Sequence, residues 1–167
     1  MNLLLTINDN TFEPQDYYII RKVVRAVILD ETETKVLFFG SLLVGGGVED
    51  GESDEDALHR ESMEEVGATV KIIKPLGEII AYRDSLKKKY IVHGYLCKKI
   101  GELVTPTSTD PEEQSTEPVW IDIITAIKKL EDEISSLQSN RPSFELEVFQ
   151  RKVHNRKVAL TFLKEII

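Results

Sequence analysis

The sequence predicts a mixed α/β domain, in which a β-sheet packs against helices. One observation is a set of β-prone apolar runs, which lie at residues 17–29, 36–39, 68–73, 76–82 and 90–97. Another is a helical segment that follows three consecutive glycines, Gly45 to Gly47, and stops before Gly67. Two further helical patterns occupy residues 122–137 and 143–167. Because 167 residues suit one core, we expect a single domain over residues 1–167.

The strand at residues 17–29 reads YYIIRKVVRAVIL, and both of its alternating sets of side chains are mostly apolar. We therefore expect it to be covered on both faces. Arg25 is the exception, and it is either a surface residue or a cation close to a phosphate or an acidic loop. Arg83 begins a basic turn at residues 83–89, and we take both arginines as candidates for binding an anionic substrate. Pro75 is expected to end the strand at residues 68–73.

The helix that follows the glycines has clear signals at both ends. Ser53 lies at the N-cap position, with Asp56 three residues later in capping-box spacing. Acidic residues fill the first turn, where the helix dipole favours them. Gly67 suits the left-handed conformation that ends a helix.

Three glutamates of this helix share one face, because Glu61, Glu64 and Glu65 are spaced i, i+3, i+4. Glu61 and Glu65 project into the apolar sector, where a structural helix would carry Leu or Ala. Packed carboxylates repel one another and lose hydration unless a cation neutralises them. A hard divalent cation such as Mg²⁺ does this with oxygen ligands. The alternative is a solvated acidic helix, which charge runs usually form.

Residues 46–68 read GGVEDGESDEDALHRESMEEVGA, and their spacing resembles the signature of the Nudix hydrolases, the MutT-like family. That signature is GX5EX7REUXEEXGU, where U is bulky and apolar, and all seven fixed glycine or charged positions match. The resemblance implies the Nudix fold, a mixed β-sheet sandwiched between helices, over about residues 23–130. Ser62 departs from the signature because an apolar residue is usual there. Val44 stands where proline is common.

The resemblance also implies roles for the charged residues of the motif. Glu64 and Glu65 would hold Mg²⁺, with Mn²⁺ as the alternative ion, and Glu61 would be a further ligand or the base that activates water. Arg60 would orient these carboxylates, and Glu52 would brace the loop. The sequence does not decide which glutamate is the base.

Other parts of the motif and one loop complete the expected site. Gly46 and Gly47 allow close approach of the backbone to a ligand. The long polar loop at residues 105–118 carries acids just before Trp120. By the resemblance, Glu117 and, second, Glu113 are candidates for completing the metal site, with a solvated loop acid as the alternative. His93 lies within a predicted strand, where a hydrogen-bonded wall residue is expected more often than a catalyst.

The predicted reaction is metal-dependent hydrolysis of a diphosphate bond in a nucleoside diphosphate linked to another group. A nucleoside triphosphate or a related nucleotide is the expected substrate. The alternatives are an isomerase on the same fold, a nucleotide-sensing module without turnover, and an acidic structural helix. The loops that would select the nucleotide carry no recognisable signature.

Composition and charge limit the expected partners and compartment. A net charge of −8 and a pI near 5.0 argue against a nucleic-acid-coating surface. Cys97 is the only cysteine, which excludes an intramolecular disulfide and a Cys zinc site. We expect a cytoplasmic protein with no membrane partner, because no apolar run is long enough for a signal peptide or a membrane span. The basic segment at residues 143–167 is either a homodimer face or an ordinary surface helix.

Overall fold

The computed structural model describes residues 1–8, 16–40, 42–139 and 146–167. Its strands are β1 (Leu3–Ile7), β2 (Ile19–Leu29), β3 (Lys35–Phe39), β4 (Leu42–Leu43), β5 (Thr69–Arg83), β6 (Lys88–Ile100) and β7 (Pro118–Asp122). Its helices are α1 (Asp54–Val66), α2 (Pro111–Gln114), α3 (Ile123–Ser139) and α4 (Leu146–Lys164), with a 3-10 turn at Asp84–Leu86. None of the helices in these described ranges is long and apolar enough to cross a membrane.

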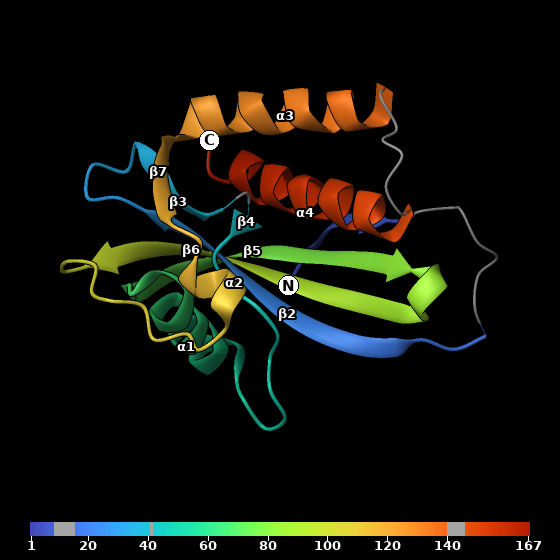
Figure 1. The fold of residues 1–167 in the computed structure, drawn as a ribbon, viewed down its shortest axis with the longest axis horizontal. Helices are drawn as coiled ribbons and strands as arrows, with labels where there is room; N and C mark the ends of the chain where they lie inside the picture. Colours follow the sequence, from blue (N-terminus) through green and yellow to red (C-terminus); the bar gives the residue numbers. More distant parts are fainter. Residues whose placement is uncertain (9–15, 41, 140–145) are drawn as a thin grey trace.

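The described strands form one mixed sheet in the order β1-β5-β6-β2-β3-β4, and β7 also pairs with β3. Strands β2 and β6 run parallel along the whole of β2, from Ile19 opposite Lys88 to Leu29 opposite Lys98. Strand β1 is parallel to β5, whereas the β5–β6 and β3–β7 pairs are antiparallel. Helix α1 covers one face, and α3 and α4 cover the other (Figure 1). The predicted α/β sandwich is therefore confirmed.

Strand β2 is buried on both faces only in its second half, because its first four residues, Ile19 to Lys22, are exposed. Val24, Ala26 and Ile28 belong to the cluster that packs against α1. Val27 and Leu29 belong to the opposite cluster, which includes residues of α3 and α4. This double burial fixes the strand that carries Arg25 between the two helical layers.

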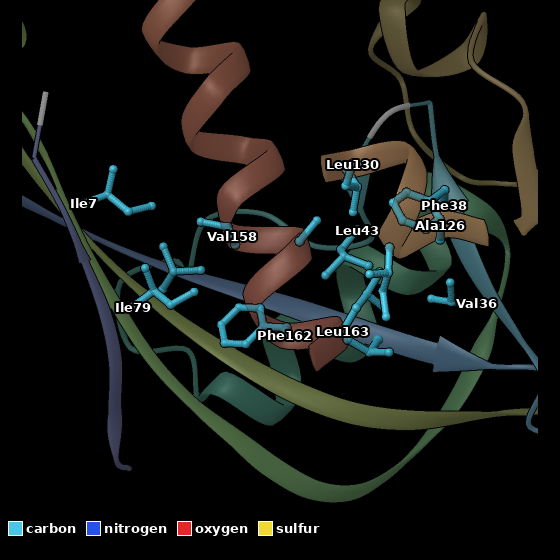
Figure 2. Packing of buried hydrophobic residues seen from close by; sticks show 14 of the residues in the cluster. Ile7, Val36, Phe38, Leu43, Ile79, Ala126, Leu130, Val158, Phe162 and Leu163 are labelled. Atoms are coloured by element: carbon cyan, nitrogen blue, oxygen red, sulfur yellow. The ribbon is translucent and has the colours of Figure 1, made fainter. Parts of the chain in front are cut away.

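Helix α4 lies close to the sheet because β6 carries a glycine beneath it. A Cβ atom added to Gly94 would lie 2.3 Å from the ring of Phe162, which is fully buried. Figure 2 shows Val158, Phe162 and Leu163 of α4 directed into the cluster that contains Ile79. The predicted C-terminal helix is thus present as α4, although residues 143–145 lie outside the described ranges.

The prediction that Pro75 ends a strand is wrong, because β5 continues through it from Thr69 to Arg83. The pairing of β5 with β6 shifts register between Ile72 and Lys74 and again between Pro75 and Gly77. A bulge accommodates a residue that cannot donate a backbone hydrogen bond, so proline bends this strand without ending it. The polar loop at residues 105–118 likewise contains the short helix α2.

Candidate active site

Helix α1 begins and ends where its capping residues predict. The Ser53 hydroxyl accepts a hydrogen bond from the Asp56 backbone N–H at 3.1 Å. Gly67 is left-handed, with φ of 63°, and its N–H donates to the Met63 carbonyl. A Cβ at Gly67 would lie 1.8 Å from the Val104 carbonyl oxygen, so only glycine lets the following loop cross the helix end.

Arg60 lies at the centre of a charged network on one side of α1. Its Nε and Nη2 atoms donate to the two carboxylate oxygens of Glu52 at 2.8 and 2.9 Å. Its Nη1 atom donates to Glu61 at 2.8 Å and to Glu64 at 3.1 Å. A further bond from Nη2 reaches the Gly47 carbonyl at 2.9 Å. One guanidinium therefore connects the glycine loop, the following turn and two glutamates of the helix.

This network sets the protonation of its members. The hydrogen bonds from Arg60, with one from the Glu49 backbone N–H, lower the pKa of Glu52 to about 2. The same contact with Glu52 raises the pKa of Arg60 above its ordinary value. Glu52 and Arg60 are therefore a fully ionised pair at neutral pH.

The glycine loop approaches the other two glutamates closely. The Gly45 backbone N–H donates to Glu65 at 2.8 Å. A Cβ at Gly46 would lie 2.4 Å from the Glu61 Oε1 atom, so a larger residue would displace that carboxylate. A Cβ at Gly47 would meet nothing nearer than an Arg21 nitrogen at 3.7 Å. Gly46 is thus the position where the absence of a side chain matters most for the acids.

Burial changes the charge state of Glu65 and Glu61. It raises the pKa of Glu65 to about 8, although the Gly45 hydrogen bond and the Arg25 charge act in the opposite direction. Burial also raises the pKa of Glu61, against the lowering effect of Arg60. Two neighbouring carboxyl groups on one helix face therefore resist ionisation in the absence of an added cation.

The sequence of this chain matches the family model of the NUDIX domain over residues 20–139, which is more than half of its length. The chain belongs to the Nudix family. Its members are hydrolases that act on small nucleoside diphosphate derivatives and generally use divalent metals, and the chain is a Nudix pyrophosphohydrolase by family. No curated protein matches its sequence.

Solved structures that resemble this one show the same fold. A NUDIX hydrolase from Nitrosomonas europaea is 18% identical, with a TM-score of 0.54 over 84% of this chain and 90% of that chain. A MutT protein from Methanosarcina mazei Go1 is 16% identical, with a TM-score of 0.50 over 87% and 98%. A UDP-X diphosphatase is 20% identical, with a TM-score of 0.51 over 66% of this chain and 55% of its own length.

The carboxylates of the Nudix helix fit a hard divalent cation in their chemistry. Oxygen donors of Glu61 and Glu65 lie together in a desolvated setting, where a positive ion restores the charge balance. Across the described residues, no three acidic, histidine or cysteine side chains are already grouped as an ion site. Instead, Arg60 holds Glu61 and Glu64. Metal binding would therefore require these two side chains to turn from Arg60 toward Glu65.

Of the two predicted loop acids, Glu113 is the one that interacts with helix α1. Its charge contributes to the raised pKa of Glu65, and it accepts a hydrogen bond from the Ser108 hydroxyl. The Ser108 backbone N–H donates to the Glu64 carbonyl at 3.1 Å, which fastens this loop to α1. The Glu117 side chain is exposed. The geometry therefore favours Glu113 over Glu117, the reverse of the order expected from the sequence.

The two predicted anion-binding arginines line one cavity. Arg25 and Arg83 come from β2 and the end of β5, and the cavity lies between the sheet and α4. Arg25 Nη1 lies 3.5 Å from the Leu43 carbonyl oxygen, and its charge acts on Glu65 and Glu61. Burial lowers the pKa of Arg25 from its ordinary value, against these two carboxylates.

Sequence reasoning missed a second polar network, which attaches the start of α1 to the sheet. His93 Nδ1 lies 2.5 Å from an Asp54 oxygen, and Nε2 lies 3.1 Å from Glu78. The Tyr95 hydroxyl donates to the same Asp54 oxygen at 2.7 Å. Burial raises the pKa of Asp54, but the bonds from His93 and Tyr95 outweigh it and leave that pKa below its ordinary value. The expected role of His93 as a hydrogen-bonded wall residue agrees with these contacts.

Proposed function

We propose that this protein hydrolyses the diphosphate bond of a nucleoside diphosphate linked to another group, with Mg²⁺ or Mn²⁺ as cofactor. The observation that carries the proposal is the contact of the glycine loop with two buried glutamates of α1. Gly45 donates a hydrogen bond to Glu65, and Gly46 lies against Glu61. Burial there raises the pKa of Glu65 to about 8. A carboxylate that has lost its hydration by burial is strongly stabilised by a divalent cation.

In this proposal, Glu61, Glu64 and Glu65 bind the metal through their carboxylate oxygens. An ion held there would supply a water of lowered pKa and neutralise charge on the phosphates. Arg60 holds Glu61 and Glu64 in place until the metal binds, and the Glu52 contact keeps Arg60 itself in position. The general base remains a choice between Glu61 and an acid of the 105–118 loop, for which Glu113 is the better placed.

Arg25 would contact the substrate phosphates in this scheme. It lies between the acidic face of α1 and the cavity beneath α4, and its desolvated guanidinium favours an anion. The resemblance in fold to a UDP-X diphosphatase adds UDP-linked compounds to the substrates worth testing. Nucleoside triphosphates, ADP-ribose and dinucleoside polyphosphates complete the set.

The test is a panel of these compounds with millimolar Mg²⁺ or Mn²⁺, scored for release of nucleoside monophosphate. We expect turnover of at least one compound, and a loss of ~10³-fold or more in Glu65→Gln and Glu64→Gln with the fold retained. Glu55→Gln is the matched control, because Glu55 lies on the same helix with its side chain 73% exposed. Tight binding without product over hours, or wild-type rates in both variants, would exclude the proposal.

A further inference from the structure

A cavity of about 100 Å³ lies between the sheet and helix α4. Apolar residues of β2, β6 and α4 form much of its wall, and its charged lining residues are three arginines. Arg25 and Arg83 come from the sheet, and Arg151, His154 and Asn155 come from α4. No Asp or Glu of the described chain is among its lining residues. Three guanidinium groups facing one cavity make an anion its electrostatic complement.

Two buried side chains of this cavity have polar atoms that lack partners in the described structure. Arg83 is 8% exposed, and its Nε has no hydrogen-bond partner among the described residues. Its Nη2 makes only long contacts with Glu147, at 3.3 Å to the carbonyl and 3.4 Å to the half-exposed carboxylate. His154 is also 8% exposed, and its Nδ1 is likewise unpaired in this part of the chain. Buried donors of this kind are costly unless a ligand or water satisfies them.

Burial, reinforced by the charges of Arg83 and Lys157, lowers the pKa of His154 to about 4. The imidazole is therefore neutral at pH 7 and offers one N–H without adding charge. In the tautomer with the proton on Nδ1, an anion in the cavity would accept a hydrogen bond from His154 as well as from the arginines. The cationic surroundings that disfavour a second positive charge at His154 are the same surroundings that favour a negative ligand.

The size of the cavity restricts what it holds. Its volume of about 100 Å³ is well below the ~300 Å³ or more of a pocket that encloses a whole ligand. A phosphate or carboxylate group fits within this space, and a larger ligand would extend beyond it. Arg25 lines the cavity, and its guanidinium also interacts electrostatically with Glu65 and Glu61, so this side chain connects the cavity with the glutamates of α1.

We propose that this cavity binds a second anionic group of the substrate, a phosphate or a carboxylate separate from the diphosphate that is cleaved. This inference rests on the proposed hydrolase function and narrows its substrate class to nucleoside diphosphates linked to an anionic moiety. Helix α4 is the element that confers the preference, through Arg151 and His154. It lies beyond residue 139, where the match to the family model ends, so these residues are outside the Nudix motif.

A binding experiment tests the cavity independently of catalysis. Inorganic phosphate is titrated by calorimetry into the full-length protein in EDTA, where no metal is available to bind it. Arg151 is exposed, so Arg151→Gln should fold normally, and Lys152→Gln on the same exposed turn of α4 removes an equal charge outside the cavity lining. We expect Arg151→Gln and His154→Gln to weaken phosphate binding about tenfold, and Lys152→Gln to change it less than about twofold. Equal binding by all three variants and the wild type would overturn the inference.

A kinetic experiment then compares UDP-glucose with UDP-glucuronate, which differ by one carboxylate. We expect kcat/KM to favour the anionic compound about tenfold or more, and Arg151→Gln to abolish the preference mainly through KM. Cleavage of both compounds at equal rates, unchanged by Arg151→Gln, would overturn the inference and leave the hydrolase function intact. Phosphate binding that depends on Arg151, without cleavage of any diphosphate, would support the anion site and exclude the hydrolase function.

Discussion

Two glutamates near helix α1 have pKa values shifted in opposite directions, Glu52 beside Arg60 and Glu65, on which the more distant Arg25 acts. On the Arg60 side, Glu52 receives two charge-assisted hydrogen bonds at 2.8 and 2.9 Å, and its pKa falls to about 2. On the Arg25 side, Glu65 receives one backbone hydrogen bond from Gly45, and burial raises its pKa to about 8. For Glu52 the hydrogen bonds from Arg60 and Glu49 are larger than the effect of burial, whereas for Glu65 burial is the largest effect and neither Gly45 nor Arg25 offsets it.

Glu61 lies between the two sides and shares features of both. It accepts a hydrogen bond from Arg60 at 2.8 Å, yet burial still raises its pKa. The charge of Glu52 is therefore balanced by Arg60, whereas Glu61 and Glu65 lack enough nearby positive charge. That deficit is the physical reason to place a metal there rather than beside Glu52.

The largest effect that would test this contrast is the pH dependence of stability without metal. Glu65 has a folded-state pKa raised from 4.5 to about 8, so its contribution is fully present below about pH 4.5 and is lost as the pH rises through 8. We expect the Glu65 contribution to the unfolding free energy in EDTA, taken as the difference between the wild type and Glu65→Gln, to fall by about 3 kcal/mol between pH 5 and pH 8. The difference is used because His154, whose pKa is lowered to about 4, changes the stability of both proteins in the opposite sense. Denaturant titrations at several pH values would measure it.

Two controls assign this pH dependence to Glu65. Glu65→Gln should remove this fall, because the amide cannot ionise, and Mg²⁺ should reduce it in the wild type by neutralising the carboxylate. Glu52 acts in the opposite sense, since its lowered pKa gives stability that is present above about pH 4.5 and lost as the pH falls through 2. An unchanged alkaline slope in Glu65→Gln would contradict the assignment.

A second prediction concerns the removal of the Arg60 charge. Arg60→Gln leaves Glu52, Glu61 and Glu64 without their shared partner, and we expect a loss of about 2–3 kcal/mol of stability. Arg60→Lys should recover only part of this, because an ammonium cannot make the paired contact with Glu52. His59→Gln is the neighbouring control, since His59 is exposed and should change stability by less than ~0.5 kcal/mol. Equal stability of Arg60→Gln and His59→Gln would contradict the importance of the network.

Local sequence patterns were sufficient to predict α1 and its caps, because Ser53, Asp56 and Gly67 act on residues a few positions away. Spacing also placed Glu61, Glu64 and Glu65 on one face. It did not distinguish their environments, since burial depends on what packs opposite. Arg60 reaches Glu52 across the turn, while Gly45 of the glycine loop and Arg25 of β2 act on Glu65.

The parts that sequence reasoning missed all depend on distant segments. The cavity combines Arg25 and Arg83 with Arg151 and His154 of α4, more than 60 residues later in the chain. Pro75 was misjudged because a bulge, which depends on the partner strand, let β5 continue. Glu113 and Glu117 have the same local chemistry, and only the fastening of their loop to α1 separates them. Such features require tertiary contacts that no local pattern contains.

A third prediction compares two adjacent glycines that the motif treats alike. Gly46→Ala places a Cβ 2.4 Å from Glu61 Oε1, whereas Gly47→Ala meets only ordinary contact at 3.7 Å. Neither residue has positive φ, so the backbone tolerates alanine at both. We expect Gly46→Ala to lower kcat/KM about tenfold with little loss of stability, because the flexible Glu61 side chain moves aside, and Gly47→Ala to stay within about twofold. Equal kinetics for the two variants would show that the position of Glu61 is unimportant.

The smallest predicted effect concerns Ser62, the residue of α1 that departs from the family signature. It is fully buried, and its hydroxyl has no hydrogen-bond partner among the described residues. Serine in place of the usual apolar residue therefore weakens packing without adding a hydrogen bond. Ser62→Ala should therefore stabilise the protein by about 1 kcal/mol. Ser53→Ala should have the opposite sign and cost about 1 kcal/mol, because the Ser53 hydroxyl caps the helix. Thermal and denaturant unfolding of both variants would measure these changes in stability. A destabilised Ser62→Ala would show that the buried hydroxyl has a hydrogen-bond partner in solution, and would place a polar contact on the apolar side of α1.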